Sequence, residues 1–427
     1  MPPGLADQVA SARESPVEVA QAMKEMDIKL NKSIFEEAWG AVYTMYYDTT
    51  AGERWSADDW IDARSHVFDS GKLVFSSRER THDAIRDIVS AIGDPYTRFL
   101  TPEEYRYELE ARSDKVLNNA GIGLQLVDPF DGVDDLQILA PLPESPAERA
   151  GIHPGDYLEA IDDIDIAYAH MTPDEAIAVL RGPEGTPVSL TLRTDASDRK
   201  EILLNRRPLS MKAVRSEVVE NELGKTGYVR IHLFTSRARE ELVDNIRSMI
   251  VDGVDAIVID VRNCLGGVFQ EALVIASAFI DCPDCVLVQT LDGNGIERNH
   301  IVEKQRCVLP GVIVPTNIPM AVLVNGGSAS SSEVLAVALK ENGRATLIGE
   351  RTFGKGLIQH SFVLRDGSAV TMTVAEYVTP RRHQHLQNKG ARPDIACRAA
   401  PAKSATEDLC VDRASRALLL PRQTGVL

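Results

Sequence analysis

The chain has 427 residues, of which 44% are apolar and 26% are charged, a balance typical of a globular protein with two or three domains. Its net charge of −17 argues against a nucleic-acid-binding protein, because such proteins need a basic face. The sequence lacks an apolar run of about 18 residues, so no transmembrane helix is expected. Residues 1–26 lack the basic and apolar regions of a signal peptide. We therefore expect a chain that is soluble where it is made or that lacks its presequence.

The sequence contains six cysteines, which are sparse for a disulfide scaffold of this length: Cys264, Cys282, Cys285, Cys307, Cys397 and Cys410. Cys282 and Cys285 form a single CxxC motif. Without a second pair or nearby histidines, this motif is a weak signal for zinc, and no metal site is expected. A redox pair is the alternative, but two separate thiols on a turn are the favoured interpretation.

Four segments follow one another along the chain. Residues 15–115 are predicted to be helical, because aromatic and apolar side chains recur at threes and fours. Residues 116–206 contain short strands around two short helices, which indicates a small β-rich module. Residues 207–399 alternate strands and helices, and this pattern predicts an α/β layer with parallel strands. Residues 400–427 form a less patterned tail, in which residues 418–420 are apolar enough to dock. The expected fold class is therefore α/β and multidomain.

The segment from Asn325 to Glu333 contains four serines between a buried strand and a predicted helix. A serine here would lie at the carboxyl end of a strand, where open α/β sheets place ligands. It would also lie at the positive end of a helix, which favours developing negative charge. The alternative is structural, because Ser330 and Glu333 have the spacing of a capping box. This segment alone leaves both interpretations open.

A lysine between two glycines, Lys355, follows Ser330 by 25 residues. A lysine deprotonates a serine only in its neutral form, so burial or nearby positive charge has to favour that form. Residues 349–355 also match the G-x-x-x-x-G-K pattern of a phosphate-binding loop. However, Gly356 occupies the Ser or Thr position, and residues 357–362 are predicted to form a strand rather than a helix. A nucleotide-dependent enzyme is therefore disfavoured.

The third candidate segment, Asp260 to Gly267, ends in two glycines directly after a buried strand. Glycines allow a backbone amide to approach a ligand closely. An amide there, together with the amide of Ser331, would form an oxyanion hole, in which one donor contributes about 3 kcal/mol to transition-state stabilisation. The alternative is a strand-to-helix turn that requires glycine geometry.

These three segments together resemble the carboxyl-terminal processing peptidases, the tail-specific proteases of the S41 type. Residues 260–267 resemble that family's D-L-R-x-N-P-G-G segment, residues 325–333 its N-x-G-[ST]-A-S-[AS]-S-E segment, and residues 349–359 its G-E-x-T-[FY]-G-K-G-x-x-Q segment. The likeness extends over residues 39–395. The sequence departs from the family pattern at Cys264 and Leu265, where the family has Asn and Pro.

The resemblance implies a role for each matching residue. Ser330 would be the nucleophile, Lys355 the general base, and Gln359 the residue that orients the lysine. Gly266 and Ser331 would supply the oxyanion amides. Asp260, Arg262 and Glu333 would support the active site. No metal, nucleotide or other cofactor is implied.

The β-rich module resembles a PDZ domain. Gly121, Ile122, Gly123 and Leu124 resemble its carboxylate-binding loop, and residues 145–156 its second hallmark. The resemblance implies that the loop binds the free C-terminus of a protein substrate, which adds to the module as a strand. Arg181 would couple the position of this module to the active site, or it is a surface arginine at a helix end.

The expected function is a serine endopeptidase that cleaves near the C-terminus of protein substrates. The alternative is an inactive PDZ scaffold with a protease-like body. Residues 94–102, with Trp39 and Trp60, resemble the photosynthetic branch that processes the precursor of the photosystem II D1 protein. This likeness implies a thylakoid lumen or periplasm-like compartment. A protein substrate is the expected partner, nucleic acid is not, and any membrane association would be peripheral.

Overall fold

The structure is a computed structural model that describes residues 16–48, 55–69, 73–94, 96–112, 120–127, 135–142, 144–169, 171–194, 198–209, 213–399, 401–402 and 404–420. The expected segment boundaries at residue 15, between residues 115 and 116 and at residue 400 lie outside these ranges. The chain divides into two compact units. One comprises Met1–Leu109, Leu291–Ile296 and Leu357–Ala375, and the other contains the remaining residues. Within the described ranges, no helix has the length and apolarity needed to cross a membrane.

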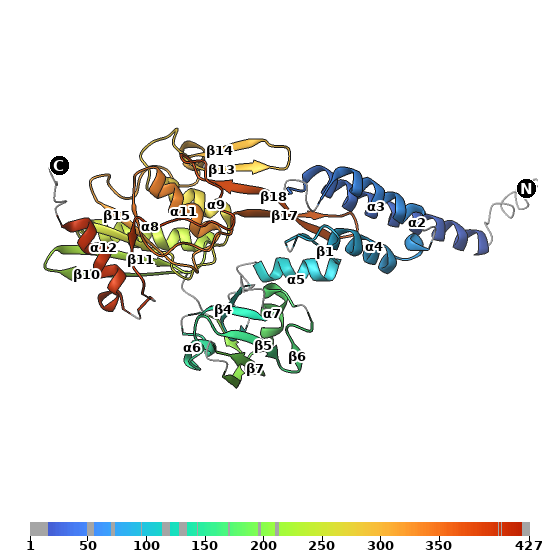
Figure 1. Ribbon diagram of the computed structural model, residues 1–427, viewed down its shortest axis with the longest axis horizontal. Coiled ribbons are helices and arrows are strands. Elements are labelled where there is room, and N and C mark those ends of the chain that lie inside the picture. Colours follow the sequence, from blue (N-terminus) through green and yellow to red (C-terminus); the bar gives the residue numbers. More distant parts are fainter. Residues whose placement is uncertain are drawn as a thin grey trace, which may run out of the picture. The chain divides into compact units, whose positions relative to one another are not determined.

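The first unit combines the N-terminal helices with a hairpin from late in the chain (Figure 1). Its elements are α2 (Pro16–Met45), α3 (Ala57–Asp69), η1 (Val74–Ser76), α4 (Arg78–Ser90), β1 (Arg98–Leu100), the start of α5 (Pro102–Arg112), β17 (Leu357–Val363) and most of β18 (Ala369–Val378). Strand β1 pairs antiparallel with β18, with Phe99 opposite Val370. Phe35 of α2 and Ile85 of α4 share one core with Val370 and Phe99. The predicted helices are confirmed, and so is the strand predicted over residues 357–362.

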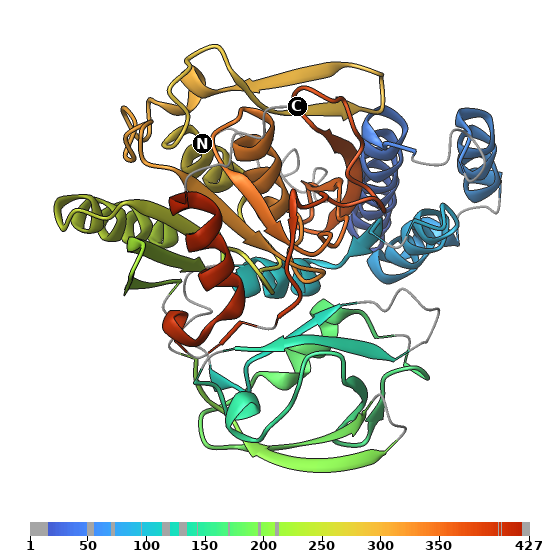
Figure 2. The same ribbon diagram turned by 60° about the vertical axis from the view of Figure 1, so that its left-hand side comes forward.

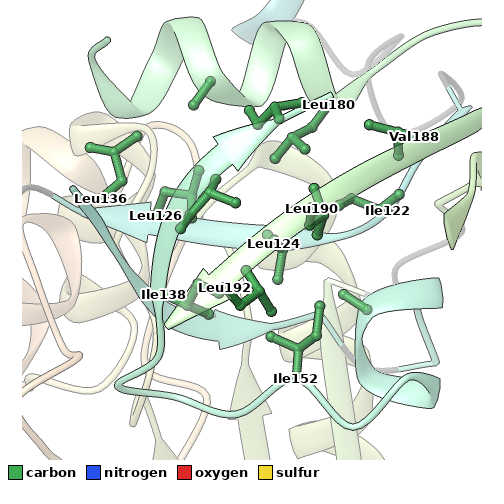
Figure 3. Close-up of a cluster of buried hydrophobic side chains, with 14 of the residues drawn as sticks. Ile122, Leu124, Leu126, Leu136, Ile138, Ile152, Leu180, Val188, Leu190 and Leu192 are labelled. Atoms are coloured by element: carbon green, nitrogen blue, oxygen red, sulfur yellow. The ribbon is translucent and has the colours of Figure 1, made fainter. Parts of the chain in front are cut away.

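The β-rich module forms a sheet in the order β3 (Leu124–Val127), β4 (Leu136–Pro141), β5 (Tyr157–Ile161), β7 (Pro187–Arg193), β8 (Arg199–Asn205), with β6 (Ile164–Asp165) paired to β5. Two short strands, β2 (Ala120–Gly121) and β9 (Arg207–Pro208), pair separately. The helices are α6 (Pro146–Arg149) and α7 (Pro173–Leu180). Alternate strand residues such as Leu124, Ile138 and Leu190 point into one core, which Leu180 of α7 completes (Figure 3). Thr172 caps α7 in a capping box with Glu175, as its sequence indicates.

The α/β body is built on a sheet in the order β10 (Val214–Asn221), β11 (Gly224–Ile231), β12 (Ala256–Asp260), β15 (Met320–Val324), β16 (Thr346–Gly349), β19 (Ile395–Ala396). Its first pair is antiparallel and the other pairs are parallel. Every residue of β12 and β15 is buried, which is why both strands are continuous apolar runs in the sequence. The remaining elements are α8 (Ser236–Val251), α9 (Phe269–Ser277), β13 (Val286–Asp292), β14 (Glu297–Ile301), α10 (Val302–Gln305) and α11 (Ser331–Glu341). The predicted alternation of strands and helices is confirmed.

The C-terminal tail is more ordered than its sequence pattern suggests. It forms η3 (Ala405–Glu407) and α12 (Leu409–Leu419), and Figure 2 shows α12, in red, lying across the strands of the main sheet. Cys410, Val411 and Ala414 share a buried cluster with sheet residues that include Val258 and Leu323. The tail therefore supplies part of the core of the α/β body.

Two disulfides are present, Cys282–Cys285 and Cys397–Cys410. The expectation of two separate thiols at Cys282 and Cys285 is wrong. The turn between these residues brings their Cα atoms to 5.4 Å, which is within the range that a disulfide requires. Of the remaining cysteines, Cys264 is buried and Cys307 is exposed.

Candidate active site

Three loops meet at one edge of the main sheet because β12, β15 and β16 are neighbouring parallel strands. They are the loops after Asp260, after Val324 and after Gly349. Each contains one of the segments singled out in the sequence. This is the edge at which open α/β sheets bind ligands.

The serine loop distinguishes Ser330 from its three neighbours. The neighbours are fully buried, and their hydroxyl groups donate to backbone carbonyls of the adjacent loop: Ser328 to Val261 at 2.8 Å, Ser331 to Gly267 at 3.0 Å and Ser332 to Cys264 at 2.7 Å. Ser330 is partly exposed. Of these four side chains, Ser330 is therefore the one that can meet a substrate.

The backbone of Ser330 is strained. Its φ is 53° and its ψ is −118°, an unusual conformation for a residue with a side chain. The residue ends the loop after β15, and α11 begins at the next residue. Strained residues of this kind cluster at functional sites, where the surrounding structure holds them in place. The sharp turn presents Ser330 at the positive end of the helix.

Glu333 connects the serine loop to the lysine loop. Its carboxylate is fully buried and accepts hydrogen bonds from the backbone N–H groups of Ser330 at 3.0 Å, Gly354 at 2.8 Å and Lys355 at 2.9 Å, and from the hydroxyl of Thr352. Burial raises the pKa of Glu333 above its usual value, although these four donors act in the opposite direction. The contact to Ser330 is one half of the predicted capping box, so helix capping and site assembly use the same carboxylate.

The lysine loop continues into strand β17, as predicted, and not into the helix that a phosphate-binding loop requires. Lys355 is partly buried. Gln359 lies on β17 in the first unit, and its Nε2 is buried without a hydrogen-bond partner among the residues that the structure describes. In the same part of the chain, no group of three or more His, Cys, Asp or Glu side chains could hold a metal ion.

The glycine loop packs directly against the nucleophile candidate. Gly266 has a φ of +102°, and a Cβ atom added there would lie 2.8 Å from the backbone nitrogen of Ser331 and 3.1 Å from Cβ of Ser330. Only glycine fits this position without displacing the serine loop. The backbone at Gly266 and the N–H of Ser331 are therefore adjacent, as an oxyanion hole requires.

Asp260 and Arg262 form a buried cluster beneath this loop. Nη2 of Arg262 lies 2.6 Å from Oδ2 of Asp260, and its Nε lies 3.0 Å from Oδ1. The hydroxyl of Tyr228 donates to the same carboxylate at 2.7 Å. Burial, the largest single effect, opposes ionisation of Asp260, but the charge and hydrogen bonds of Arg262, together with the charge of Arg230, outweigh it and hold the pKa of this carboxyl below its usual value. The pair is therefore ionised in the interior of the protein.

Two further residues of this region, Thr352 and Asp408, were not among those predicted from the sequence. Thr352 donates to Glu333, and its hydroxyl also accepts a hydrogen bond from the N–H of Ala391 at 2.6 Å. Asp408 contacts Arg262 at 2.7 Å from the C-terminal tail. The available signal for Asp408 was its position before a helix, which is a capping signal and does not identify a partner.

In the β-rich module, the candidate carboxylate-binding loop lies between β2 and β3. Ile122 and Leu124 point into the core, and Gly123 has a φ of +79°. A Cβ atom at Gly123 would lie 2.3 Å from Cβ of Ser145, so the loop backbone is held close to the start of α6. Strand β3 is at the edge of its sheet, beside α7, and Arg181 caps the end of this helix. Among the described residues, β3 pairs with β4 alone. An unpaired strand edge next to a helix is the arrangement in which a peptide adds as a further strand.

Comparison with known protein families identifies two regions of the chain. Residues 225–397 match the model of peptidase family S41, and residues 137–194 match a PDZ domain. The chain is 36% identical to a carboxyl-terminal-processing protease of Picosynechococcus sp. over 361 residues, which cover 84% of this chain and 81% of the relative. It is 31% identical to the chloroplastic carboxyl-terminal-processing peptidase 1 of Arabidopsis thaliana over 387 residues, which cover 90% of this chain and 75% of the relative.

A solved structure is similar over almost the whole chain. The photosystem II D1 C-terminal processing protease superposes with a TM-score of 0.75 and 29% identity, and the match covers 91% of this chain and 97% of that one. The expected fold class, a peptidase core with an N-terminal helical segment and an inserted PDZ domain, is confirmed.

Proposed function

We propose that Ser330 is the nucleophile and Lys355 the general base of this chain. The chain belongs to peptidase family S41 and is a carboxyl-terminal-processing serine protease. The observation that carries this assignment is the acceptor that both residues share, because Oε2 of Glu333 receives the backbone N–H of each. One buried carboxylate thus fixes two backbones that are far apart in the sequence. Holding reacting groups in place in this way removes much of the entropic cost of the reaction.

The reaction follows from these two groups. Oγ of Ser330 attacks the carbonyl carbon of the scissile peptide bond while its proton passes to the neutral amine of Lys355. The tetrahedral intermediate collapses, Lys355 returns the proton to the leaving amine, and an acyl group remains on Ser330. Water then gives a proton to Lys355 and attacks the ester. Lys355 returns this proton to Oγ of Ser330 as the second tetrahedral intermediate collapses, which releases the shortened protein and restores both residues.

The glycine loop and the helix start support stabilisation of the intermediate. The amides of Gly266 and Ser331 are proposed to donate to the oxyanion, each contributing about 3 kcal/mol. The positive end of α11 acts in the same direction. Gln359, four residues after Lys355, is proposed to orient the lysine. Asp260 and Arg262 support the loop that contains Gly266.

The PDZ domain is proposed to bind the substrate's tail. Backbone amides of residues 121–124 would hold the terminal carboxylate, and the peptide would add to the free edge of β3. Specificity for a free C-terminus follows from this arrangement, because an internal segment of a protein has no carboxylate for the loop. Arg181, at the end of α7, is proposed to couple tail binding to the active site.

The substrate class is proposed from the relatives. One is named as a processing protease of the photosystem II D1 protein and others as chloroplastic, so we propose the D1 precursor as substrate and a thylakoid lumen or periplasm-like space as compartment. Two disulfides support an oxidising compartment. The net charge of −17 supports a protein rather than a nucleic-acid substrate.

The test uses purified full-length protein and a peptide with a free apolar C-terminus, with cleavage followed by mass spectrometry. We expect Ser330→Ala and Lys355→Ala to lower kcat by more than about a thousandfold. Ser332→Ala is the matched control, because it removes a serine hydroxyl that is committed to a carbonyl. Equal cleavage rates for wild type and Ser330→Ala would refute the assignment of Ser330 as the nucleophile. Tight peptide binding by wild type without cleavage would instead support an inactive PDZ scaffold.

A further inference from the structure

Arg262 is held by a residue that the S41 family match does not include. The match ends at residue 397, whereas Oδ2 of Asp408 lies 2.7 Å from Nη2 of Arg262 and Oδ1 lies 3.3 Å from Nη1. The side chains of both residues are only 1% exposed. The guanidinium thus makes paired contacts to two carboxylates, that of Asp260 on its own loop and that of Asp408 from the tail.

The charge of Asp408 is itself stabilised by donors. Oδ1 accepts hydrogen bonds from the N–H groups of Cys410 at 2.9 Å and Val411 at 3.2 Å, at the start of α12. Oδ2 accepts one from the N–H of Ala402 at 2.9 Å. The start of α12 carries partial positive charge, so a second buried carboxylate beside one guanidinium is tolerated.

The Cys397–Cys410 disulfide closes the segment that holds Arg262. Its two cysteines are separated by 13 residues along the chain. Between them lie Asp408 and Ala399, whose carbonyl accepts from Nη1 of Arg262 at 3.2 Å. The N–H of Cys397 donates to the carbonyl of Gly349, at the end of β16. Within the described part of the chain, the carbonyl of Ala399 and the carboxylate of Asp408 are the groups outside the loop of Arg262 that accept hydrogen bonds from its guanidinium. The disulfide thus fixes both of them to the main sheet.

The contacts continue from Arg262 to the oxyanion loop. Asn263 follows Arg262 and has a φ of 55°. Its N–H donates to Oδ1 of Asn325 at 2.9 Å, and Nδ2 of Asn325 donates to Oδ1 of Asn263 at 2.7 Å. The carbonyl of Cys264 then accepts the N–H of Ala329 at 3.0 Å. Gly266 follows and packs against Ser330. A shift of Arg262 therefore displaces the loop that carries the proposed oxyanion amide.

We propose that Asp408 is a positioning residue for the peptidase reaction, which acts through Arg262 on the oxyanion loop and is anchored by the Cys397–Cys410 disulfide. The inference rests on the proposed function, because it deepens the role of Gly266. Asp408 touches neither substrate nor reacting atoms. Its loss affects the geometry of the transition state and leaves the PDZ domain intact.

The kinetic test compares Asp408→Asn with wild type and with Asp408→Glu on the same peptide. Asparagine retains the capacity to cap α12 but removes the charge that faces Arg262. We expect Asp408→Asn to lower kcat at least about tenfold while KM stays within about twofold, and Asp408→Glu to restore part of kcat. The matched control is Asp412→Asn. This variant removes an exposed carboxylate on α12 that pairs with Arg416, four residues later on the same helix. Wild-type kcat in Asp408→Asn would overturn the proposal.

A second pair of variants tests the anchor and does not depend on the folding of Asp408→Asn. Cys397→Ser with Cys410→Ser is compared with Cys282→Ser with Cys285→Ser, so that each variant loses one disulfide. We expect a kcat loss only for the first pair, with KM unchanged in both. Equal kcat values in the two double variants would overturn the role of the disulfide.

Hydrogen exchange measured by mass spectrometry separates failure of this inference from failure of the proposed function. We expect residues 262–267 to exchange at least about tenfold faster in Asp408→Asn than in Asp412→Asn, whether or not the wild type cleaves the peptide. Unchanged exchange in this loop would overturn the positioning role. An inactive wild type with faster loop exchange in Asp408→Asn would refute the peptidase assignment alone.

Discussion

The backbone N–H groups of Ser330 and Lys355 donate to the same oxygen, Oε2 of Glu333, at 3.0 and 2.9 Å. The two residues belong to loops after different strands, β15 and β16. A buried carboxylate satisfies both amides, so neither loop can shift without leaving a polar group unpaired. The proposed nucleophile and base are therefore placed by the backbone as well as by their side chains.

Replacement of Glu333 by glutamine tests this arrangement. An amide has one acceptor oxygen and a donor group that faces the N–H groups of the lysine loop, so we expect the free energy of unfolding to fall by about 2 kcal/mol. We also expect kcat to fall at least about tenfold. The measurements are chemical denaturation and peptide cleavage. Glu341→Gln is the control, because Glu341 is on the same helix and accepts the N–H groups of Arg381 and Arg382 at the surface. Similar losses in both variants would contradict the role of Glu333.

Replacement of Gly266 by alanine tests the oxyanion loop. The added Cβ would meet the backbone nitrogen of Ser331 at 2.8 Å, and the φ of +102° is itself unfavourable for alanine. We expect kcat to fall by about a hundredfold, as for loss of one oxyanion donor, with a smaller change in KM. Gly311→Ala is the matched control, because Gly311 has a φ of +80° with open space around it. Normal kcat in Gly266→Ala would exclude this loop from the reaction.

Replacement of Gly123 by alanine tests tail binding. A Cβ atom there would overlap Ser145, so the loop that is proposed to hold the terminal carboxylate has to move. We expect KM for a peptide with a free C-terminus to rise about tenfold while kcat changes little, because the change weakens ground-state and transition-state binding equally. Gly151→Ala is the control in the same domain, with a φ of +72° and no atoms nearby. A C-terminally amidated peptide should show no difference between the two variants, and a difference there would contradict the carboxylate role.

His232 predicts a loss of stability in acid. Burial, with Arg230 as a second cause, lowers the pKa of this side chain from 6.5 to about 4. The unfolded chain then binds a proton between pH 6.5 and pH 4 that the folded chain does not, so stability is complete above pH 6.5 and falls as the pH drops toward 4. The full effect is about 3 kcal/mol. We expect His232→Gln to flatten the pH dependence of the free energy of unfolding in this range. The control is His153→Gln at an exposed position, and equal flattening in both variants would refute the assignment.

Several features of the site could be predicted because they depend on neighbouring residues. The buried strand before Asn325, the capping relation between Ser330 and Glu333 and the strand after Gly356 are all patterns within a few residues. The order of the motifs then indicated the family. The choice of Ser330 among four serines rested on its distance from Lys355 along the chain, and the burial of the other three hydroxyl groups is an independent reason for the same choice.

The sequence by itself determined the motifs and the helices and strands that flank them, because hydrophobic periodicity, helix caps and glycine turns depend on residues that are close together in the chain. Only the tertiary structure decided that β1 pairs with β18, that Cys397 joins Cys410 and that Asp408 meets Arg262 across 146 residues of sequence. An aspartate before a helix looks the same whether its carboxylate faces water or a buried guanidinium. Its partner is set by which surfaces pack together, and packing depends on the shape of the whole core rather than on any local pattern.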